Sequence, residues 1–240
     1  MPAAPDAPDD DGSVEAGSGT GSASGVRADR ETDPDNTVVT DADYSYRPLL
    51  EATGFGSAAW LIGYLLTYLV TRPSTADDIR MEILESTTGQ PMTLEVVAWT
   101  YFNAHFVATD IPDGGVFAFL PARQNVLLDG DGLEWLLFVL PPVVLVGAGA
   151  LTTYRHRHGL EEWVDGATTG AMVLVGYLSC TVVALVLTTV AVDAGIIRPV
   201  PFDAILTAGL IYPFLFGAIG GGLGYAVVGR RQVDEPVETT

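Results

Sequence analysis

The run that most constrains this chain is residues 204–229, AILTAGLIYPFLFGAIGGGLGYAVVG, which contains no Asp, Glu, His, Lys or Arg. A helix needs about 20 apolar residues to cross a hydrocarbon core about 30 Å thick, and this run is longer than that. Similar runs precede it near residues 54–71, 133–153 and 167–192. The sequence therefore predicts an all-α integral membrane protein in which four transmembrane helices pack as a bundle.

Composition agrees with this only if apolar and acidic residues are segregated along the chain. The 240 residues are 48% hydrophobic, yet the net charge is −19. Residues 1–46 are rich in Asp, Glu, Gly, Ser and Pro, with Arg27 and Arg30 as the only basic residues. Such a segment cannot bury enough apolar surface to offset its chain entropy. We expect a disordered acidic tail at 1–46, a membrane domain at 47–231 and a short C-terminal tail at 232–240.

All 11 basic residues are arginine, and the chain has no lysine. An acid-rich, lysine-free composition is typical of halophilic archaea, whose proteins must stay hydrated in concentrated salt. Nucleic acid is not an expected partner, because binding phosphates requires clustered basic charge. Cys180 is the single cysteine, so the chain cannot form an internal disulfide.

Residues 72–132 form the one long connection between the predicted helices, and we expect a mostly helical extracellular insert. Within it, residues 93–109 read TLEVVAWTYFNAHFVAT. A helix here places Tyr101 and His105 on one side, suited to the bundle or the lipid surface. A strand is the alternative, since the segment is rich in β-branched and aromatic residues. Whether the segment is interfacial, packed on the bundle or partly inserted stays open.

Asn103 and His105 are the only residues that we single out as candidates for chemistry. A buried or interfacial histidine is the more common explanation of His105. Apart from Glu134 at the very start of the run 133–153, the predicted membrane helices hold no His, Asp or Glu to activate a nucleophile, so we do not expect an enzyme. His156 and His158 are two residues apart and do not share a helical face, which favours an interfacial anchor over a metal site. No metal and no cofactor are expected.

Prolines interrupt two of the predicted helices. Pro141 and Pro142 fall in the middle of the run 133–153, where they predict a kink, and Pro213 does the same in the last run. Each proline frees a backbone carbonyl one turn earlier. A plain structural bend is the simpler interpretation, and a hinge or the lining of a polar cavity is the alternative.

Small residues recur at four-residue spacing in the last two runs. This spacing lets helix backbones approach closely, which in lipid is a main source of helix association. We expect close packing of the fourth helix against the third, or against a second copy of itself, with a glycine-lined pore as the alternative. The predicted packing positions are Gly166, Gly170, Gly176, Gly209, Gly217, Gly220, Gly221 and Gly224.

Arginines suggest an orientation in the cell membrane. Four crossings place both termini on one side, together with Arg47, Arg155, Arg157, Arg230 and Arg231. The opposite side has Arg72, Arg80, Arg123 and Arg198. Because short loops dominate the positive-inside rule, both termini are predicted to be cytoplasmic.

Three segments, WTYFNAHFV at 99–107, LLFVLPPVVLVGAG at 136–149 and YPFLFGAIGGGLGY at 212–225, resemble a group of small multi-pass membrane proteins of haloarchaea. The likeness extends over about residues 50–231 and leaves out the acidic tail. The resemblance implies the same host and topology, and it implies no particular activity.

These features predict a structural or accessory membrane component that packs through glycine-rich helices. The alternative is a small-solute permease or channel, in which carbonyls freed by the prolines line a path. The expected partners are the lipid bilayer and either another copy of the chain or a second membrane protein.

Overall fold

The computed structural model describes residues 41–75, 79–118, 120–128 and 133–234, and it is mostly helical. Four helical stretches are long and apolar enough to cross a membrane: Tyr46–Thr71, Trp135–Arg155, Trp163–Leu187 and Pro201–Val227. The prediction of four such helices is confirmed. Residues 1–40 of the predicted tail 1–46 lie outside the described residues. Its last six residues, 41–46, belong to the first helix.

The first stretch belongs to α1, Asp41–Thr75, which is longer than the predicted run 54–71. The second consists of η2, a 3-10 helix at Leu133–Phe138, and α4, Leu140–Arg155. Pro141 and Pro142 therefore lie in the first turn of α4, not in the middle of an α-helix as the prediction of a kink assumed. The first turn tolerates proline because the N–H that proline lacks has no partner within the helix there.

The third stretch is formed by α5, Trp163–Ala171, and α6, Leu174–Leu187. It ends five residues before the predicted boundary at 192, because Val190–Val192 is strand β3. Uncharged, β-branched residues are compatible with either state, so the apolar run alone could not locate this boundary.

The last stretch begins with α7, Pro201–Asp203, and continues through η4, a π-helix at Ala204–Ile211, into α8, Tyr212–Asp234. The N–H of Tyr212 donates to the carbonyl of Thr207, five residues back, as a π-helix requires. Pro213 follows directly and has no N–H to donate to the carbonyl of Gly209. The wide turns thus end where proline enters the helix.

The insert is helical only in its first half. It contains α2, Ile79–Thr88, and α3, Thr93–Asn103, followed by β1, Thr109–Asp110, the short 3-10 helix η1, Gly115–Phe117, and β2, Arg123–Gln124. The two short strands join β3 and β4, Gly195–Pro199, in an antiparallel sheet of order β2-β1-β4-β3. The register pairs Thr109 with Gln124 on one side and with Pro199 on the other. The expectation of a mostly helical insert is therefore only partly right.

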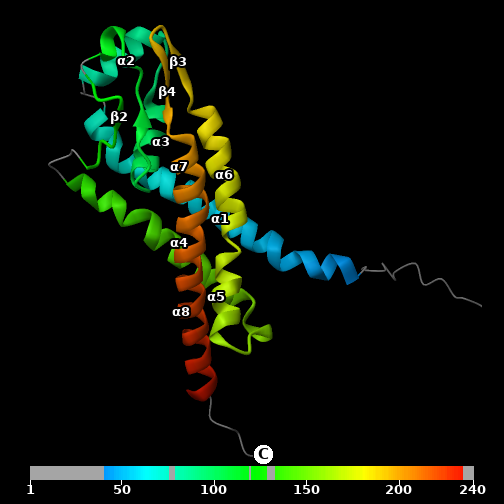
Figure 1. Ribbon diagram of the computed structural model, residues 1–240. Helices are drawn as coiled ribbons and strands as arrows, with labels where there is room; N and C mark the ends of the chain where they lie inside the picture. Colours follow the sequence, from blue (N-terminus) through cyan, green and yellow to red (C-terminus); the bar gives the residue numbers. More distant parts are fainter. Residues whose placement is uncertain (1–40, 76–78, 119, 129–132, 235–240) are drawn as a thin grey trace, which may run out of the picture. The chain divides into compact units, whose positions relative to one another are not determined.

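Two of the apolar clusters among the described residues hold most of these parts together. Trp99 packs with Leu84, Met92, Phe117, Val190 and Ile197 beneath the sheet, and its indole Nε1 donates to the Thr188 carbonyl at 2.8 Å. A larger cluster gathers side chains of α1, α3, α4, α6 and η4, with Tyr101, Leu145, Val173, Tyr177 and Ala204 at its centre. In Figure 1, β3 follows directly from the end of α6, and the sheet lies beside α2 and α3.

Glycines lie where the helices of the membrane-length stretches touch, and α8 runs beside α4 and α5 (Figure 1). Gly166 and Gly170 of α5 lie against the backbone of Gly217 and Gly221. On another side of α8, Gly220 lies against the carbonyl of Val146, and Gly224 contacts Ala150 of α4. These six predicted positions are all at contacts between two helix backbones.

The other two predicted glycines have different neighbours. Gly176 lies against Thr53 of α1, and Gly209 lies against the side chain of Leu178. Gly56 and Gly149, which the spacing did not single out, make equally close approaches, to the carbonyls of Val173 and Gly217.

Candidate functional site

The segment after α3 turns back sharply within the apolar core, and we call residues 103–107 the hairpin tip. α3 ends at Asn103, so the predicted helix 93–109 is too long by six residues. The N–H of Val107 donates to the carbonyl of Phe102 at 3.1 Å, and that of Phe106 donates to Asn103 at 2.9 Å. This is the Schellman arrangement, in which glycine usually occupies the position that Phe106 has here.

Phe106 has a φ of 60°, the only positive φ outside glycine among the described residues. Left-handed backbone costs a residue with a Cβ roughly 1–2 kcal/mol, so the surrounding contacts must hold it. The Phe106 ring stacks on Phe138 with centroids 4.6 Å apart, although 57% of Phe106 remains exposed.

The Asn103 side chain fixes the turn from inside. Its Nδ2 donates to the carbonyl of Val107 at 2.8 Å and to Thr109 Oγ1 at 3.3 Å, while its Oδ1 accepts from the N–H of Val126 at 2.9 Å. Asn125 Nδ2 donates to the Asn103 carbonyl at 3.0 Å. Asn103 is 1% exposed, and these bonds tie the hairpin tip to residues 125–126, which follow β2. The structure gives this candidate residue a positioning role.

His105 lies next to it and is also 1% exposed. Its Nδ1 lies 2.7 Å from the carbonyl of Tyr101, and its Nε2 lies 2.7 Å from the hydroxyl of Tyr177 on α6. The Tyr177 hydroxyl lies 2.7 Å from that of Tyr101. The three side chains therefore form one hydrogen-bonded group, which we call the His–Tyr cluster.

Aromatic rings surround the His–Tyr cluster on its remaining sides. The His105 ring centroid is 4.9 Å from that of Tyr212, and Trp60 of α1 meets the edge of Tyr101 at 5.5 Å. Gly63 of α1 lies directly against the Tyr101 hydroxyl, where any side chain would collide with it. The cluster thus joins α3 to α1, α6 and the start of α8.

Burial lowers the pKa of His105 from 6.5 to about 4, although its bond to the Tyr101 carbonyl acts in the opposite direction. Burial also raises the pKa of Tyr101, and its hydrogen bond to Tyr177 opposes that change. At neutral pH the whole cluster is therefore uncharged. This suits its apolar surroundings, since a buried charge without a counter-ion is costly.

The sequence singled out Asn103 and His105 and placed Tyr101 and His105 on one helix face. It gave no signal for Tyr177 or Tyr212, which lie 72 and more residues further along the chain. Tyrosines in apolar runs are common, and only the packing of α6 and α8 brings these two to His105.

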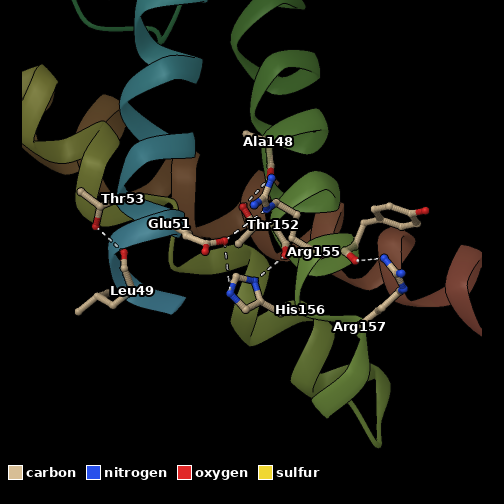
Figure 2. A network of polar contacts seen from close by, with 9 residues as sticks. Leu49, Glu51, Thr53, Ala148, Thr152, Arg155, His156 and Arg157 are labelled. Carbon is tan, nitrogen blue, oxygen red and sulfur yellow. Dashed lines mark hydrogen bonds and ion pairs between the residues drawn. The ribbon is translucent and has the colours of Figure 1, made fainter. Parts of the chain in front are cut away.

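A second polar network lies at the other end of α4 (Figure 2). Arg155 Nε and His156 Nε2 approach Glu51 Oε2 of α1 at 3.3 and 3.8 Å. His156 Nδ1 contacts the Thr152 carbonyl at 2.9 Å, and the Arg157 guanidinium lies 4.9 Å from the Tyr154 ring centroid. Figure 2 shows His156 and Arg155 turned toward the carboxylate and Arg157 turned away from it. These contacts attach α1 to α4, and exposed ion pairs of this kind contribute about 0–1 kcal/mol each.

A family model described as a family of unknown function (DUF7978) matches residues 32–228, more than half of the chain. The chain belongs to that family. Comparison with curated proteins and with solved structures gives no match. The matched region includes the hairpin tip, the His–Tyr cluster, the Glu51 network and every glycine contact described above.

Proposed function

We propose that this family member is a multi-pass protein of the cell membrane in which the four apolar stretches are transmembrane helices. Their outward faces support this, because they expose large apolar side chains that would be costly in water. Val186 and Leu187 at the end of α6 are 69% and 73% exposed, and similar side chains line α1 and α8: Leu61, Leu65, Leu69, Phe214, Leu223 and Val227. Lipid is the solvent that such faces fit.

Within that membrane we propose the role of a structural or accessory component, which associates with other membrane proteins or with copies of itself. The observation that carries this proposal is the backbone contact of α8 with both α4 and α5 through glycine. Because Gly217, Gly220 and Gly221 are covered by neighbouring helices of the same chain, they do not line an open path. This supports packing over the glycine-lined pore.

The permease alternative loses one of its supports in the same way. Pro141 and Pro142 lie in the first turn of α4, directly after the 3-10 helix η2, so they do not interrupt the hydrogen bonds of an α-helix. Pro213 adjoins the π-helix, whose wider hydrogen bonds accommodate the missing N–H.

For orientation we propose cytoplasmic termini, with α2 and the sheet outside and α3 entering the helix packing from that side. The lysine-free, acidic composition supports a haloarchaeal host. A labelling experiment tests the topology: a Cys180→Ala chain with Leu128→Cys or Arg157→Cys is treated in intact cells with a membrane-impermeant thiol reagent. The Leu128→Cys chain should react and the Arg157→Cys chain should react only after lysis. The opposite pattern would invert the proposed topology, and equal reaction of both in intact cells would argue against a crossing between them.

Reconstitution into liposomes distinguishes the accessory role from that of a permease. Liposomes that contain the purified chain should show no solute flux above protein-free liposomes, whereas native membranes should yield the chain in a complex of fixed stoichiometry. Specific, saturable flux in liposomes would exclude a purely accessory role and support the permease. A monomer without a partner in gently solubilised membranes would contradict the accessory role.

A further inference from the structure

Three costly local structures meet at the hairpin tip. His105 is a titratable group in the apolar interior, Phe106 has left-handed backbone, and the π-helix η4 ends at Tyr212, whose ring lies 4.9 Å from that of His105. Strained backbone and π-helical turns concentrate at functional sites because folding alone does not favour them. Their coincidence around one histidine indicates a site that goes beyond the structural role proposed above.

The hydrogen bonds of the His–Tyr cluster have only one consistent direction. The Tyr101 carbonyl can only accept, so Nδ1 of His105 carries the hydrogen and Nε2 of the neutral ring is an acceptor. Tyr177 has one hydroxyl hydrogen and donates it to Nε2. The Tyr101 hydroxyl must then donate to the Tyr177 oxygen. The ring of bonds begins and ends at Tyr101 and leaves no free donor.

We propose that the hairpin tip is a proton-binding site, at which protonation of His105 reverses the two hydroxyl bonds and releases the tip from α6. A hydronium ion transfers its proton to the Nε2 lone pair and leaves as water, and no covalent bond within the cluster breaks, so the cluster gains one positive charge. Nε2 then donates to the Tyr177 oxygen, and the Tyr177 hydroxyl turns to the Tyr101 oxygen. The Tyr101 hydroxyl loses its acceptor and faces α1 at Gly63.

No carboxylate balances the new charge among the described residues of this cluster. The titratable groups that face it are Tyr101 on α3, Tyr177 and Cys180 on α6, and Tyr212 on α8, and α1 contributes Trp60 and Gly63. None of these carries negative charge when His105 is protonated. A buried cation without a counter-ion is stabilised by reaching water, so the charged state favours a displaced tip.

The tip is placed to pass such a movement to the π-helix. Tyr177 is roughly 15 Å along the helix from the Leu187 end of α6, at a rise of about 1.5 Å per residue. After the hairpin tip, which lies beside Tyr177, the chain continues to β1. The N–H of Val200, the residue after β4, donates to the carbonyl of Ala108 at 2.9 Å. β4 and Val200 lead directly into α7 and η4. Displacement of residues 103–107 therefore pulls on the segment that ends at Tyr212.

Histidine NMR tests the proton site, because the chain has three histidines. The full chain is labelled with ¹⁵N-histidine in detergent micelles, and the His105→Gln variant assigns the His105 signals. We expect His105 to be the Nδ1–H tautomer at neutral pH and to gain a proton only well below pH 6.5, because burial lowers its pKa. A proton on Nε2 at neutral pH, or protonation of His105 near pH 6.5, would overturn the assignment.

Thiol reactivity tests the release. Val107 is 0% exposed, whereas Leu128 is 63% exposed and serves as the matched control. In a Cys180→Ala chain, Val107→Cys should react slowly with dithiodipyridine at about pH 7.5. The ratio of its reaction rate to that of Leu128→Cys should be about tenfold higher near pH 4 than at pH 7.5. Adding His105→Gln should abolish that increase. An unchanged rate, or an increase that persists without His105, would overturn the proposal.

Hydrogen exchange of the unaltered chain gives a second measurement if Val107→Cys does not fold. The amides of residues 104–107 should exchange faster at acid pH than the known intrinsic pH dependence allows, and those in α5 should not. Protection that is equal at both pH values would contradict release. The accessory role proposed above does not depend on this outcome, since flux and stoichiometry test it separately.

Discussion

The ring of Phe106 stacks on that of Phe138, with centroids 4.6 Å apart and planes within 21°. This contact joins the hairpin tip to η2, the 3-10 helix that leads into α4. It also explains how phenylalanine can occupy a left-handed position, because aromatic pairs contribute about 0.5–1.5 kcal/mol beyond area burial, an amount similar to the backbone penalty.

Two substitutions at Phe106 separate the ring from the backbone. Both Phe106→Ala and Phe106→Gly lose the stacking, but only glycine relieves the left-handed strain. We expect Phe106→Gly to be more stable than Phe106→Ala by about 1 kcal/mol, the reverse of the usual preference for alanine. Reversible unfolding in mixed micelles measures the difference. An alanine variant as stable as the glycine variant would show that the turn relaxes without the ring.

Adjacent glycines of α8 provide a matched test of helix packing. A side chain at Gly221 would collide with the Gly166 carbonyl, whereas nothing lies within 4 Å of a side chain at Gly222. Because the obstacle is backbone, Gly221→Leu should cost at least about 3 kcal/mol, and Gly222→Leu should change the stability little. Thermal unfolding in detergent compares the two. Equal melting temperatures would mean that α5 and α8 are not in contact.

The four apolar helices could be predicted because long apolar runs are a property of the sequence alone. Their ends could not: Val190–Val192 is as apolar as α6, and it becomes a strand only because β4 pairs with it. Pro141 and Pro142 were placed inside a helix since nothing in the run showed that residues 133–138 would form a 3-10 turn.

The candidate site divides in the same way. His105 was identifiable as an unusual residue in an apolar segment, and Tyr101 follows from the helical period. Tyr177 and Tyr212 were not identifiable, because their approach to His105 depends on how α6 and α8 pack. Gly63 was missed for a related reason, since its neighbour is a side-chain hydroxyl and it takes no part in a four-residue stripe.

Stability should depend on pH through His105. Its pKa is about 4 in the folded chain and near 6.5 when unfolded, so the unfolded state binds the proton first as the pH falls. The resulting loss in the free energy of unfolding begins below about pH 6.5, grows to about 2 kcal/mol at pH 5 and levels off below about pH 4. The difference in the free energy of unfolding between the unaltered chain and His105→Gln isolates the contribution of His105, because the carboxylates are the same in both chains. Parallel pH profiles for the two chains would show that His105 is not buried in the neutral form.

The position of Gly63 directly against the Tyr101 hydroxyl permits a test by rescue. Gly63→Ala improves the helix propensity of α1 by up to about 1 kcal/mol, yet its methyl group would displace the Tyr101 hydroxyl from Tyr177. We expect a net loss of about 1–3 kcal/mol. Gly54→Ala is the control on the same helix, since nothing lies within 4 Å of its Cβ, and it should be neutral or stabilising.

Removing the hydroxyl removes the shortest of the close contacts with the new methyl group and leaves those with Cζ and Cε2 of the ring at 2.7 and 2.9 Å, so Tyr101→Phe should cost less in the Gly63→Ala background than in the unaltered chain. Alone, Tyr101→Phe deprives the Tyr177 oxygen of its donor, at a cost of about 1–3 kcal/mol. The coupling between the two substitutions, measured as a double-mutant cycle in detergent, should be at least about 1 kcal/mol and of the sign that makes the double variant more stable than the sum predicts. Additive losses would place Gly63 and Tyr101 out of contact, and the hydroxyl freed by protonation of His105 would then not face α1.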